Sequence, residues 1–429
     1  MAPWLPVLAL SENYASRAML PIAAHVVTEH SRTFQASSLV ALAASSFFAG
    51  DMSMQLMVKG LVRRLGGFRL LWMGTFAWSF ALLLVPLALA ADSRVLLMLA
   101  QTAYGLFSGS AQPAAHGIIA ETVGEAGKAT VVSLVQAGAA AGTSLANFLM
   151  PLFVKRIGGK LPLIGIAVVG ILTAAVLRAS PPPPSTSVAP SASAPPLAQC
   201  HRDGAARDVV DVVSWLGDPL IFAACFAFYF SGFAYNGIFG PFLPVVFLER
   251  FGVQTAELSM LTSTAPIGNA LACVLCGVAS DALIRRCGWR ADRVRALMQL
   301  IGTVVPAAAL WLLARTRDVR VACVLVTCAM TAHGAQASGV LALLHDIGGG
   351  RAAELFAVAN SIHKFAGMLA ALVIRHVSHH SGWDAVLQIT AAHYLICAAA
   401  LLPLMGRTRQ ARARIFGAGA QARKQSKAR

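Results

Sequence analysis

Arg17 lies in the middle of an apolar segment near the start of the chain, in the stretch "NYASRAMLPIAA" at 13–24. A charge at the centre of a membrane helix costs roughly 2.5–3.5 kcal/mol on insertion-based scales, so it needs a partner or a watery cavity. On a helix, Asn13, Tyr14 and Pro21 share the face of this arginine. A guanidinium presents a planar fork of donors that suits carboxylate or phosphate. This stripe predicts a substrate or gating contact for an anion; the alternative is an arginine that only holds helices together.

Polar side chains recur in a second apolar segment, 353–375. On a helix, Asn360, Lys364 and Gly367 share one face, and His363 lies beside it. We expect Lys364 to supply a second positive charge to a binding pocket. The alternative is a lysine whose ammonium extends to the membrane–water interface while its alkyl chain stays in the apolar region.

Three further groups could carry a proton or a cation through a membrane. Asp51 lies within an apolar segment, with Gln55 four residues later, and acidic side chains at such depth often belong to coupling sites. The alternative partner of Asp51 is Lys59 or another basic residue of the following loop. His116 and His333 can relay protons because imidazole titrates near neutral pH, or can serve as interhelical hydrogen-bonding groups.

The apolar segment 219–247 carries a patch of aromatic, hydroxyl and amide side chains: Tyr229, Ser231, Tyr235 and Asn236. Such a patch is typical of the lining of a small-molecule site. In a helix bundle it can equally provide hydrogen bonds between helices, and the residues alone leave both interpretations open.

Membrane helices must position these side chains. Only 12% of the 429 residues are charged, against about 25% in soluble domains, which indicates a polytopic membrane protein. A spanning helix needs about 20 apolar residues. We predict twelve spans, at 4–27, 35–58, 70–91, 95–119, 129–154, 161–178, 219–247, 257–280, 294–314, 319–343, 353–375 and 384–405.

A Pro/Ser/Ala-rich run between the sixth and seventh spans reads as a flexible linker, because it cannot form a packed core. We predict a six-helix bundle at 1–178, a cytoplasmic linker at 179–214, a second six-helix bundle at 215–406 and a basic cytoplasmic tail at 407–429. The excess of Lys and Arg in alternate loops predicts cytoplasmic N- and C-termini. The tail is expected to contact anionic lipid headgroups.

Several classes of function are disfavoured. The net charge of +16 resides in short loops and in the tail, which favours a cytoplasmic membrane face over nucleic-acid binding. All eight cysteines occur at or after Cys200, mostly in apolar runs, and we interpret them as small apolar residues. We predict no metal, no cofactor and no enzymatic activity, since no Asp-rich or metal-ligand cluster lies on the helices.

The chain contains an internal repeat. "GDMSMQLMVKGLVRRLGGFR" follows the second span and "CGVASDALIRRCGWRADRVR" follows the eighth, and both have paired arginines and then glycine. This is what two parallel six-helix halves predict. Twelve helices with this basic loop in each half resemble the major facilitator superfamily. The second copy keeps the superfamily's loop aspartate, Asp281, before Arg285, and the resemblance implies a gating role for both; the first copy has Arg63 in the aspartate's place.

Within that superfamily, the chain resembles the organic anion and phosphate transporter family, which includes sialin, the vesicular glutamate transporters and plastid anion transporters. The similar stretches include "NYASRAMLPIA", "FFAGDMSMQLMVKGLVRRLGG", "GLFSGSAQPAAHGIIAE" and "LFAVANSIHKFAG". The resemblance implies that Arg17 recognises an anion. Ser108 replaces the acidic residue of glutamate-transporting members, and Gln101 and Gly232 replace two of their arginines. We therefore do not expect glutamate transport.

The sequence predicts a monomeric secondary transporter for a small organic or inorganic anion, coupled to protons or sodium. Substrate-binding side chains are predicted to be Asn13, Tyr14, Arg17, Tyr235, Asn236, Asn360 and Lys364; coupling or gating side chains are predicted to be Asp51, Gln55, His116, Asp281, Arg285 and His363. One alternative is a carrier of a neutral or cationic solute, which a counter-charge to Arg17 inside the pocket would favour. The other is a receptor-like member that no longer transports.

Overall fold

The computed structural model describes residues 4–28, 35–122, 128–181, 215–254, 257–348 and 352–411, and its regular elements there are all helices. Those before residue 182 are α1 (Trp4–Thr28), α2 (Ala36–Leu65), α3 (Gly67–Leu82), α4 (Leu84–Ala90), α5 (Arg94–Ser108), α6 (Ala111–Thr122), α7 (Lys128–Ile157) and α8 (Lys160–Ala179). Those after residue 214 are α10 (Pro219–Phe233), the π-helix η2 (Ala234–Phe242), α11 (Leu243–Phe251), α12 (Leu258–Arg285), α13 (Ala291–Leu313), α14 (Val319–His333), the 3₁₀-helix η3 (Gly334–Ala337), α15 (Val340–Gly348), α16 (Ala352–Leu401) and the 3₁₀-helix η5 (Leu402–Arg407).

Within the described residues, this order corresponds to twelve crossings when each interrupted helix counts once and α16 counts twice. The α16 segment breaks at Gly382, whose φ of 78° is accessible to glycine because it lacks a Cβ atom. Eight described segments are long and apolar enough to cross a membrane by composition alone. Neither α1 nor α2 is among them. These two helices carry Glu12, Arg17 and Asp51, so the polar groups of the site lower their apolar character.

Short side-chain caps begin several of these helices. Asp218 accepts hydrogen bonds from the backbone amides of Leu220 and Ile221 at the start of α10, and Asp318 does the same for the first turn of α14. Each cap satisfies amide groups that have no partner within the helix. Proline follows Asp218 at the first helical position, where its missing N–H costs nothing.

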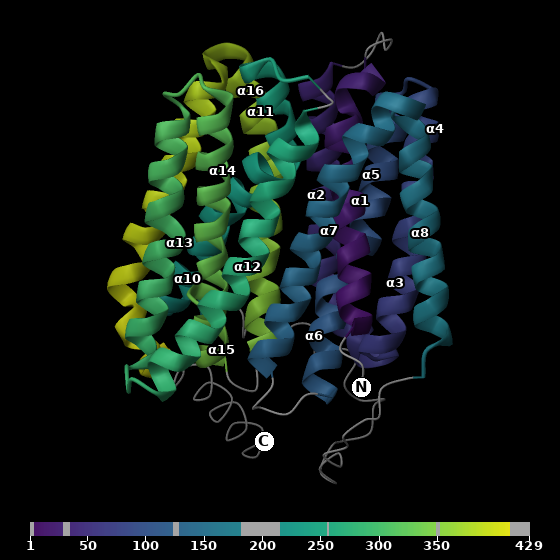
Figure 1. Ribbon diagram of the computed structural model, residues 1–429. Coiled ribbons are helices and arrows are strands. Elements are labelled where there is room, and N and C mark those ends of the chain that lie inside the picture. Colours follow the sequence, from purple (N-terminus) through teal and green to yellow (C-terminus); the bar gives the residue numbers. More distant parts are fainter. Residues whose placement is uncertain are drawn as a thin grey trace.

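The helices form two bundles that lie side by side (Figure 1). One contains α1 to α8 and the other contains α10 to α16, and the start of α1 and the end of α16 lie at the same end of the molecule. Two helix pairs form most of the interface: α2 packs against α16, and α7 packs against α12. Ser144 and Asn147 on α7 donate hydrogen bonds of 2.8 and 2.9 Å to the carbonyl oxygens of Ser263 and Thr262 on α12.

Two of the expected spans continue farther than their apolar patterns indicate. The α2 helix continues to Leu65 and α12 to Arg285, so Asp281 and Arg285, which we expected in a loop, lie in the last turns of a helix. The chain turns only afterwards, near Gly66 and Gly288, which have φ values of 75° and 67°. Backbone geometry rather than loss of apolar character therefore ends these helices. The expected linker and tail lie outside the described residues beyond positions 181 and 411 respectively.

Close backbone contact joins α2 to α5. A Cβ atom at Gly50 would collide with the carbonyl oxygen of Thr102, and one at Gly105 would collide with that of Phe47. The two glycines therefore let the helix backbones approach, as small residues do at membrane helix interfaces. This contact places Asp51 beside the break between α5 and α6, where its backbone oxygen faces Gly109.

We predict that Gly105→Ala destabilises the protein by about 1–3 kcal/mol, because the added methyl group overpacks this contact. The measurement is thermal denaturation of the purified protein in detergent. Gly165→Ala is the matched control, because a Cβ atom at that helical glycine meets nothing within 4 Å. Equal melting temperatures for the two variants would contradict the interpretation of the α2–α5 contact.

Candidate functional site

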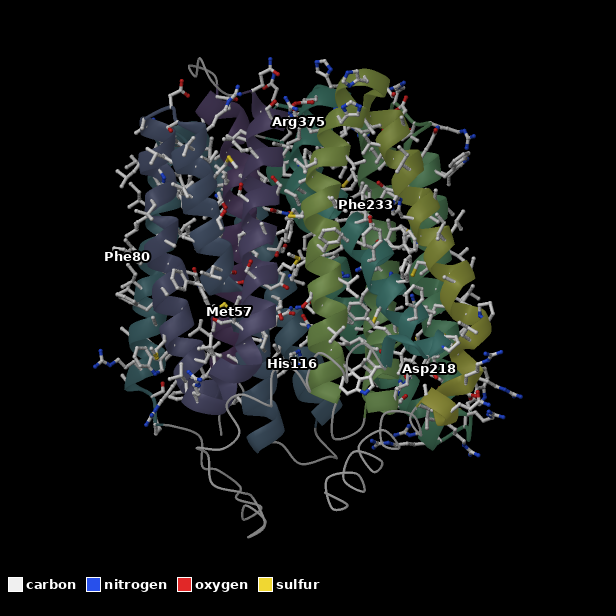
Figure 2. All side chains as sticks on the ribbon, turned by 180° about the vertical axis from the view of Figure 1, so that it is seen from behind. Met57, Phe80, His116, Asp218, Phe233 and Arg375 are labelled. Atoms are coloured by element: carbon white, nitrogen blue, oxygen red, sulfur yellow. The ribbon has the colours of Figure 1, made fainter. Side chains whose placement is uncertain are left out.

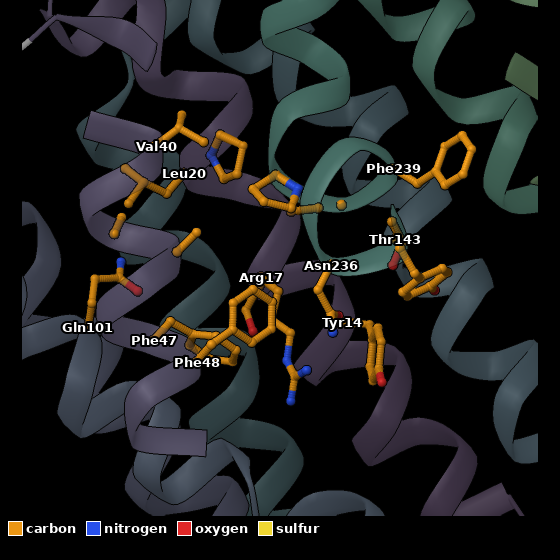
Figure 3. Close-up of a pocket in the computed structure, with 18 of the residues that line it drawn as sticks. Tyr14, Arg17, Leu20, Val40, Phe47, Phe48, Gln101, Thr143, Asn236 and Phe239 are labelled. Carbon is orange, nitrogen blue, oxygen red and sulfur yellow. The ribbon is translucent and has the colours of Figure 1, made fainter. Parts of the chain in front are cut away.

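A cavity of about 100 Å³ lies between the two halves of the molecule (Figure 3). This volume accommodates several water molecules or a small ion. The N-terminal half contributes Tyr14, Arg17, Phe47, Phe48, Gln101 and Thr143 to its wall, and the C-terminal half contributes Tyr235, Asn236, Phe239, Pro266 and Met330. Four of the predicted substrate-binding residues, Tyr14, Arg17, Tyr235 and Asn236, therefore meet at one site.

The Arg17 guanidinium is the cationic group in the wall of this cavity. Its Nη2 donates to the Ser108 hydroxyl at 2.8 Å, and its Cζ lies 4.6 and 4.8 Å from the ring centroids of Tyr14 and Phe47. Figure 3 shows the guanidinium between these rings. Its Nε has no hydrogen-bond partner in the described part of the chain. Two aromatic faces and one hydroxyl thus orient the planar fork and leave it donor capacity for an anion.

Asp51 is the counter-ion of Arg17, and it is shared with a second cation. Its Oδ2 lies 3.6 Å from Nη1 of Arg17 on α1 and 3.3 Å from Nζ of Lys364 on α16. Gln55 donates to Oδ1 at 3.3 Å and to the Gly109 carbonyl at 2.9 Å, so it links the carboxylate to the break between α5 and α6. The three charges come from both halves and form one buried group, which we call the triad: Arg17, Asp51 and Lys364.

Burial decides between the alternatives for Lys364. The residue is only 3% exposed and its ammonium pairs with a fully buried carboxylate, so it does not extend to the membrane surface. The alternative of an interfacial lysine is therefore wrong, because the attraction of Asp51 keeps the ammonium in the interior. Lys364 does not itself line the cavity; it lies behind Phe48, 5.9 Å from the centroid of that ring.

Asn13 and Asn360 lie outside the cavity wall, whereas Asn236 lines it and also bonds to the neighbouring helix α16. Asn13 is fully buried and donates to the Ser108 hydroxyl at 2.8 Å, so it positions the group that holds Arg17. Asn236 donates to the His363 carbonyl at 3.2 Å, and His363 Nδ1 lies 3.0 Å from the Phe228 carbonyl. Asn360 is buried, and its amide nitrogen has no hydrogen-bond partner within the described ranges.

The π-helix η2 explains how Tyr235 and Asn236 reach the cavity. It continues α10 with a widened turn over nine residues, and both side chains lie on it. Such π-type turns occur frequently at functional sites. Tyr235 also stacks on His333, with ring centroids 5.0 Å apart, and His333 Nδ1 lies 2.8 Å from the Tyr394 hydroxyl. His333 therefore contacts neutral partners within the C-terminal half.

Three predicted gating residues lie away from the cavity. His116 on α6 packs against Phe356 on α16, with ring centroids 5.2 Å apart, and joins the two halves. Asp281 and Arg285 lie at the end of α12 and do not pair with one another in the described structure. Among the described residues, the ion pairs near that end of the C-terminal half are instead Arg295–Asp346, at 2.9 Å, and Arg290–Asp292, at 2.7 Å.

The sequence analysis did not single out Glu12. This carboxyl group is 5% exposed, and its Oε2 accepts a hydrogen bond of 2.8 Å from Trp78 Nε1 on α3. Its Oε1 has no hydrogen-bond partner among the described residues. It lies outside the cavity wall and joins α1 to α3. An acidic residue inside the first apolar segment was the available signal.

Comparison with known proteins agrees with this architecture. The sequence profile of the Major Facilitator Superfamily matches residues 7–371, most of the chain. The chain belongs to the major facilitator superfamily. It is thus an integral membrane protein with many spans. A solved member of similar fold is a bacterial homologue of the human lysosomal transporter Spinster, in an inward-facing, unoccupied conformation; it has a TM-score of 0.67, 15% identity and 97% coverage of both chains. This likeness concerns the fold.

Curated relatives within the superfamily are anion transporters. The chain is 25% identical to the rice protein "Probable anion transporter 4, chloroplastic" over 83% of its own length and 60% of the relative's. It is 24% identical to the Arabidopsis thaliana "Ascorbate transporter, chloroplastic", over 84% and 66% of the two chains. It is 25% identical to the Arabidopsis "Sodium-dependent phosphate transport protein 1, chloroplastic", over 83% and 70%. The chain thus spans about three fifths to two thirds of the first two relatives.

We predict that Asp51 and Lys364 are energetically coupled across the two halves of this major facilitator. Asp51→Asn leaves Arg17 and Lys364 without their shared counter-ion, and Lys364→Met removes one of the two cations that pair with Asp51. The double variant should lose less stability than the two single variants together, with a coupling energy of about 0.5–3 kcal/mol. Denaturation of all four proteins in detergent measures it, and strictly additive losses would show that the two residues do not interact.

Proposed function

We propose that the protein is a secondary active transporter that moves a small anion across a membrane. The observation that carries this proposal is the Arg17 guanidinium in the wall of a cavity between the two halves. Its fork is oriented by Ser108 and by two aromatic rings before any substrate arrives. A donor group that is already oriented binds a carboxylate or phosphate with a smaller loss of conformational entropy.

The charge balance of the site supports an anion. Arg17 and Lys364 bring two positive charges and Asp51 brings one negative charge, so the triad has a surplus of one positive charge. A surplus charge at this depth is costly, and a bound monovalent anion compensates it. Asp51, Gln55 and the other groups of the α2–α5 contact lie within one half, whereas Lys364 comes from the other. An anion held here interacts with both halves at once.

The relatives support the same substrate class. Two of those named above carry ascorbate or phosphate in their names, and the third is named as a probable anion transporter. The cavity of about 100 Å³ has room for a small ion. We therefore propose a small organic or inorganic anion as the substrate.

Transport would proceed by alternating access, with the two halves rocking around the cavity. Contacts between the halves exist toward both ends of the bundle: Arg375 donates to Ser38 at 2.9 Å, and His116 packs on Phe356. Figure 2 shows Arg375 and His116 toward opposite ends of the molecule. Each set of contacts would break when the cavity opens to that side. We propose coupling to protons or sodium and cytoplasmic termini, the latter from the distribution of Lys and Arg.

One observation favours a second candidate, a carrier of a neutral or cationic solute. Asp51 is a counter-charge to Arg17, which is the feature expected for such a carrier. Lys364 weighs against it, because the second cation restores the positive surplus that Asp51 alone would cancel. A cation entering the cavity would meet the guanidinium in its wall with no free carboxylate beside it.

We predict that Arg17→Ala abolishes anion uptake and that Arg17→Lys lowers it at least tenfold, because an ammonium keeps the charge but lacks the planar fork. Purified protein in liposomes is tested with labelled phosphate, ascorbate, sialate, urate and glutamate, with and without sodium and a pH gradient. Arg317→Ala is the control, since this arginine is exposed and distant from the cavity.

Retained uptake in folded Arg17→Ala protein would remove the anchor role. Uptake of none of these anions by the wild-type protein, together with transport of a neutral or cationic solute, would establish the second candidate. Failure of any solute to move would favour a receptor-like member.

A further inference from the structure

We propose that Asp51 carries the coupling proton, and that proton and anion bind together because Asp51 and the anion compete for the same guanidinium, that of Arg17. This inference rests on the proposed function and specifies its coupling ion. It assigns to the Arg17–Asp51–Lys364 triad the role of a built-in counter-anion that the substrate replaces.

The Asp51 carboxylate occupies the position that an anion would take. Its Oδ2 contacts both Arg17 and Lys364, and its Oδ1 accepts from Gln55. The Asp51 side chain is buried. Its carboxylate thus serves as the counter-ion of both Arg17 and Lys364. An anion in the cavity must share Arg17, which lines the wall, with this carboxylate.

Two anions at this spacing in a region of low dielectric repel one another strongly. Protonation of Asp51 removes the repulsion and releases Arg17, the cation in the cavity wall, to the substrate. Because each event favours the other, linkage requires that the proton raises the affinity for the anion and the anion raises the affinity for the proton. The release of Lys364 also weakens an ion pair between α2 and α16, which joins the two halves.

Charge balance then sets the electrical character of transport. The empty triad carries a net charge of one positive unit. After a monovalent anion and a proton have bound, Asp51 is neutral and the two cations face one anion, so the net charge is unchanged. The protein therefore moves the same charge in its empty and loaded forms. Transport of a monovalent anion with one proton should not respond to membrane potential.

Sodium is disfavoured at this carboxylate. A sodium ion needs several oxygen ligands, whereas the neighbours of Oδ2 within 3.6 Å are two cationic groups and Gln55 presents its amide nitrogen to Oδ1. A proton needs only one oxygen atom as its acceptor.

The other titratable groups around Asp51 do not share its position. Tyr104 on α5 and His363 on α16 lie within its electrostatic range but form hydrogen bonds with Ser16 and with the Phe228 carbonyl. Glu12 on α1 is another buried carboxyl group near Arg17, and it accepts a hydrogen bond from Trp78 without forming an ion pair among the described residues. Glu12→Gln is therefore the matched control, because an amide oxygen can still accept from Trp78.

The test uses full-length protein in liposomes with labelled ascorbate and labelled phosphate, offered separately. Asp51→Asn mimics the protonated carboxyl group. This variant should retain exchange of labelled for unlabelled anion but lose at least nine tenths of the uptake that an inward proton gradient drives. Its exchange rate should not depend on pH over a range of roughly 5.5 to 8. Glu12→Gln should keep gradient-driven uptake.

A second measurement needs no variant. A pH dye inside wild-type liposomes should report acidification as ascorbate enters, and a potassium diffusion potential of either sign should leave ascorbate uptake unchanged. Gradient-driven uptake that survives in Asp51→Asn, or disappears in Glu12→Gln instead, would overturn the assignment. Uptake driven by sodium or by the potential would overturn it too. If wild-type protein transports none of the five anions named under the proposed function, that function itself fails; if it transports another of the five, that anion replaces ascorbate and phosphate in this test.

Discussion

One buried carboxylate, Asp51, balances two cations that approach it from opposite halves of the molecule. Without it, Arg17 and Lys364 would face one another across an apolar interface, at a large cost in free energy. With it, the two halves share an ion pair at the level of the cavity. Three helices position these charges: α1 carries Arg17, α2 carries Asp51 and α16 carries Lys364.

Close helix packing makes the contact possible. Gly50 and Gly105 let α2 and α5 approach until their backbones touch, and this brings Asp51 to the break between α5 and α6. Gly367 allows a similar approach of α16 to Phe48 on α2 and to Asn236 on η2. In a membrane, the hydrophobic effect does not drive helices together, because lipid tails are as apolar as the side chains. Contacts between small residues and buried polar pairs therefore determine much of which helices pack against one another.

Uncharged residues occupy the positions where this chain departs from the glutamate-transporting members that it resembles. Ser108 accepts a hydrogen bond from Arg17, and Gln101 lines the cavity. A side chain at Gly232 would collide with His363, so an arginine there is excluded by packing. Lys364 and Asp51 bring charges to the site from other helices. The charged groups around the cavity thus differ from the pattern that the resemblance to glutamate-transporting members implies.

The sequence by itself determined the class of the protein: the lengths of the apolar segments predicted the twelve spans, the repeated basic stretch predicted two halves, and an arginine inside the first apolar segment pointed to the proposed anion site. These are local properties, because lipid forces each span to be a helix that satisfies its own backbone. Only the tertiary structure decided that Asp51 pairs with Lys364, that η2 turns Tyr235 and Asn236 into the cavity, and that Glu12 bonds to Trp78. Such pairings depend on how helices distant in sequence are rotated and packed, and no spacing along one helix encodes that.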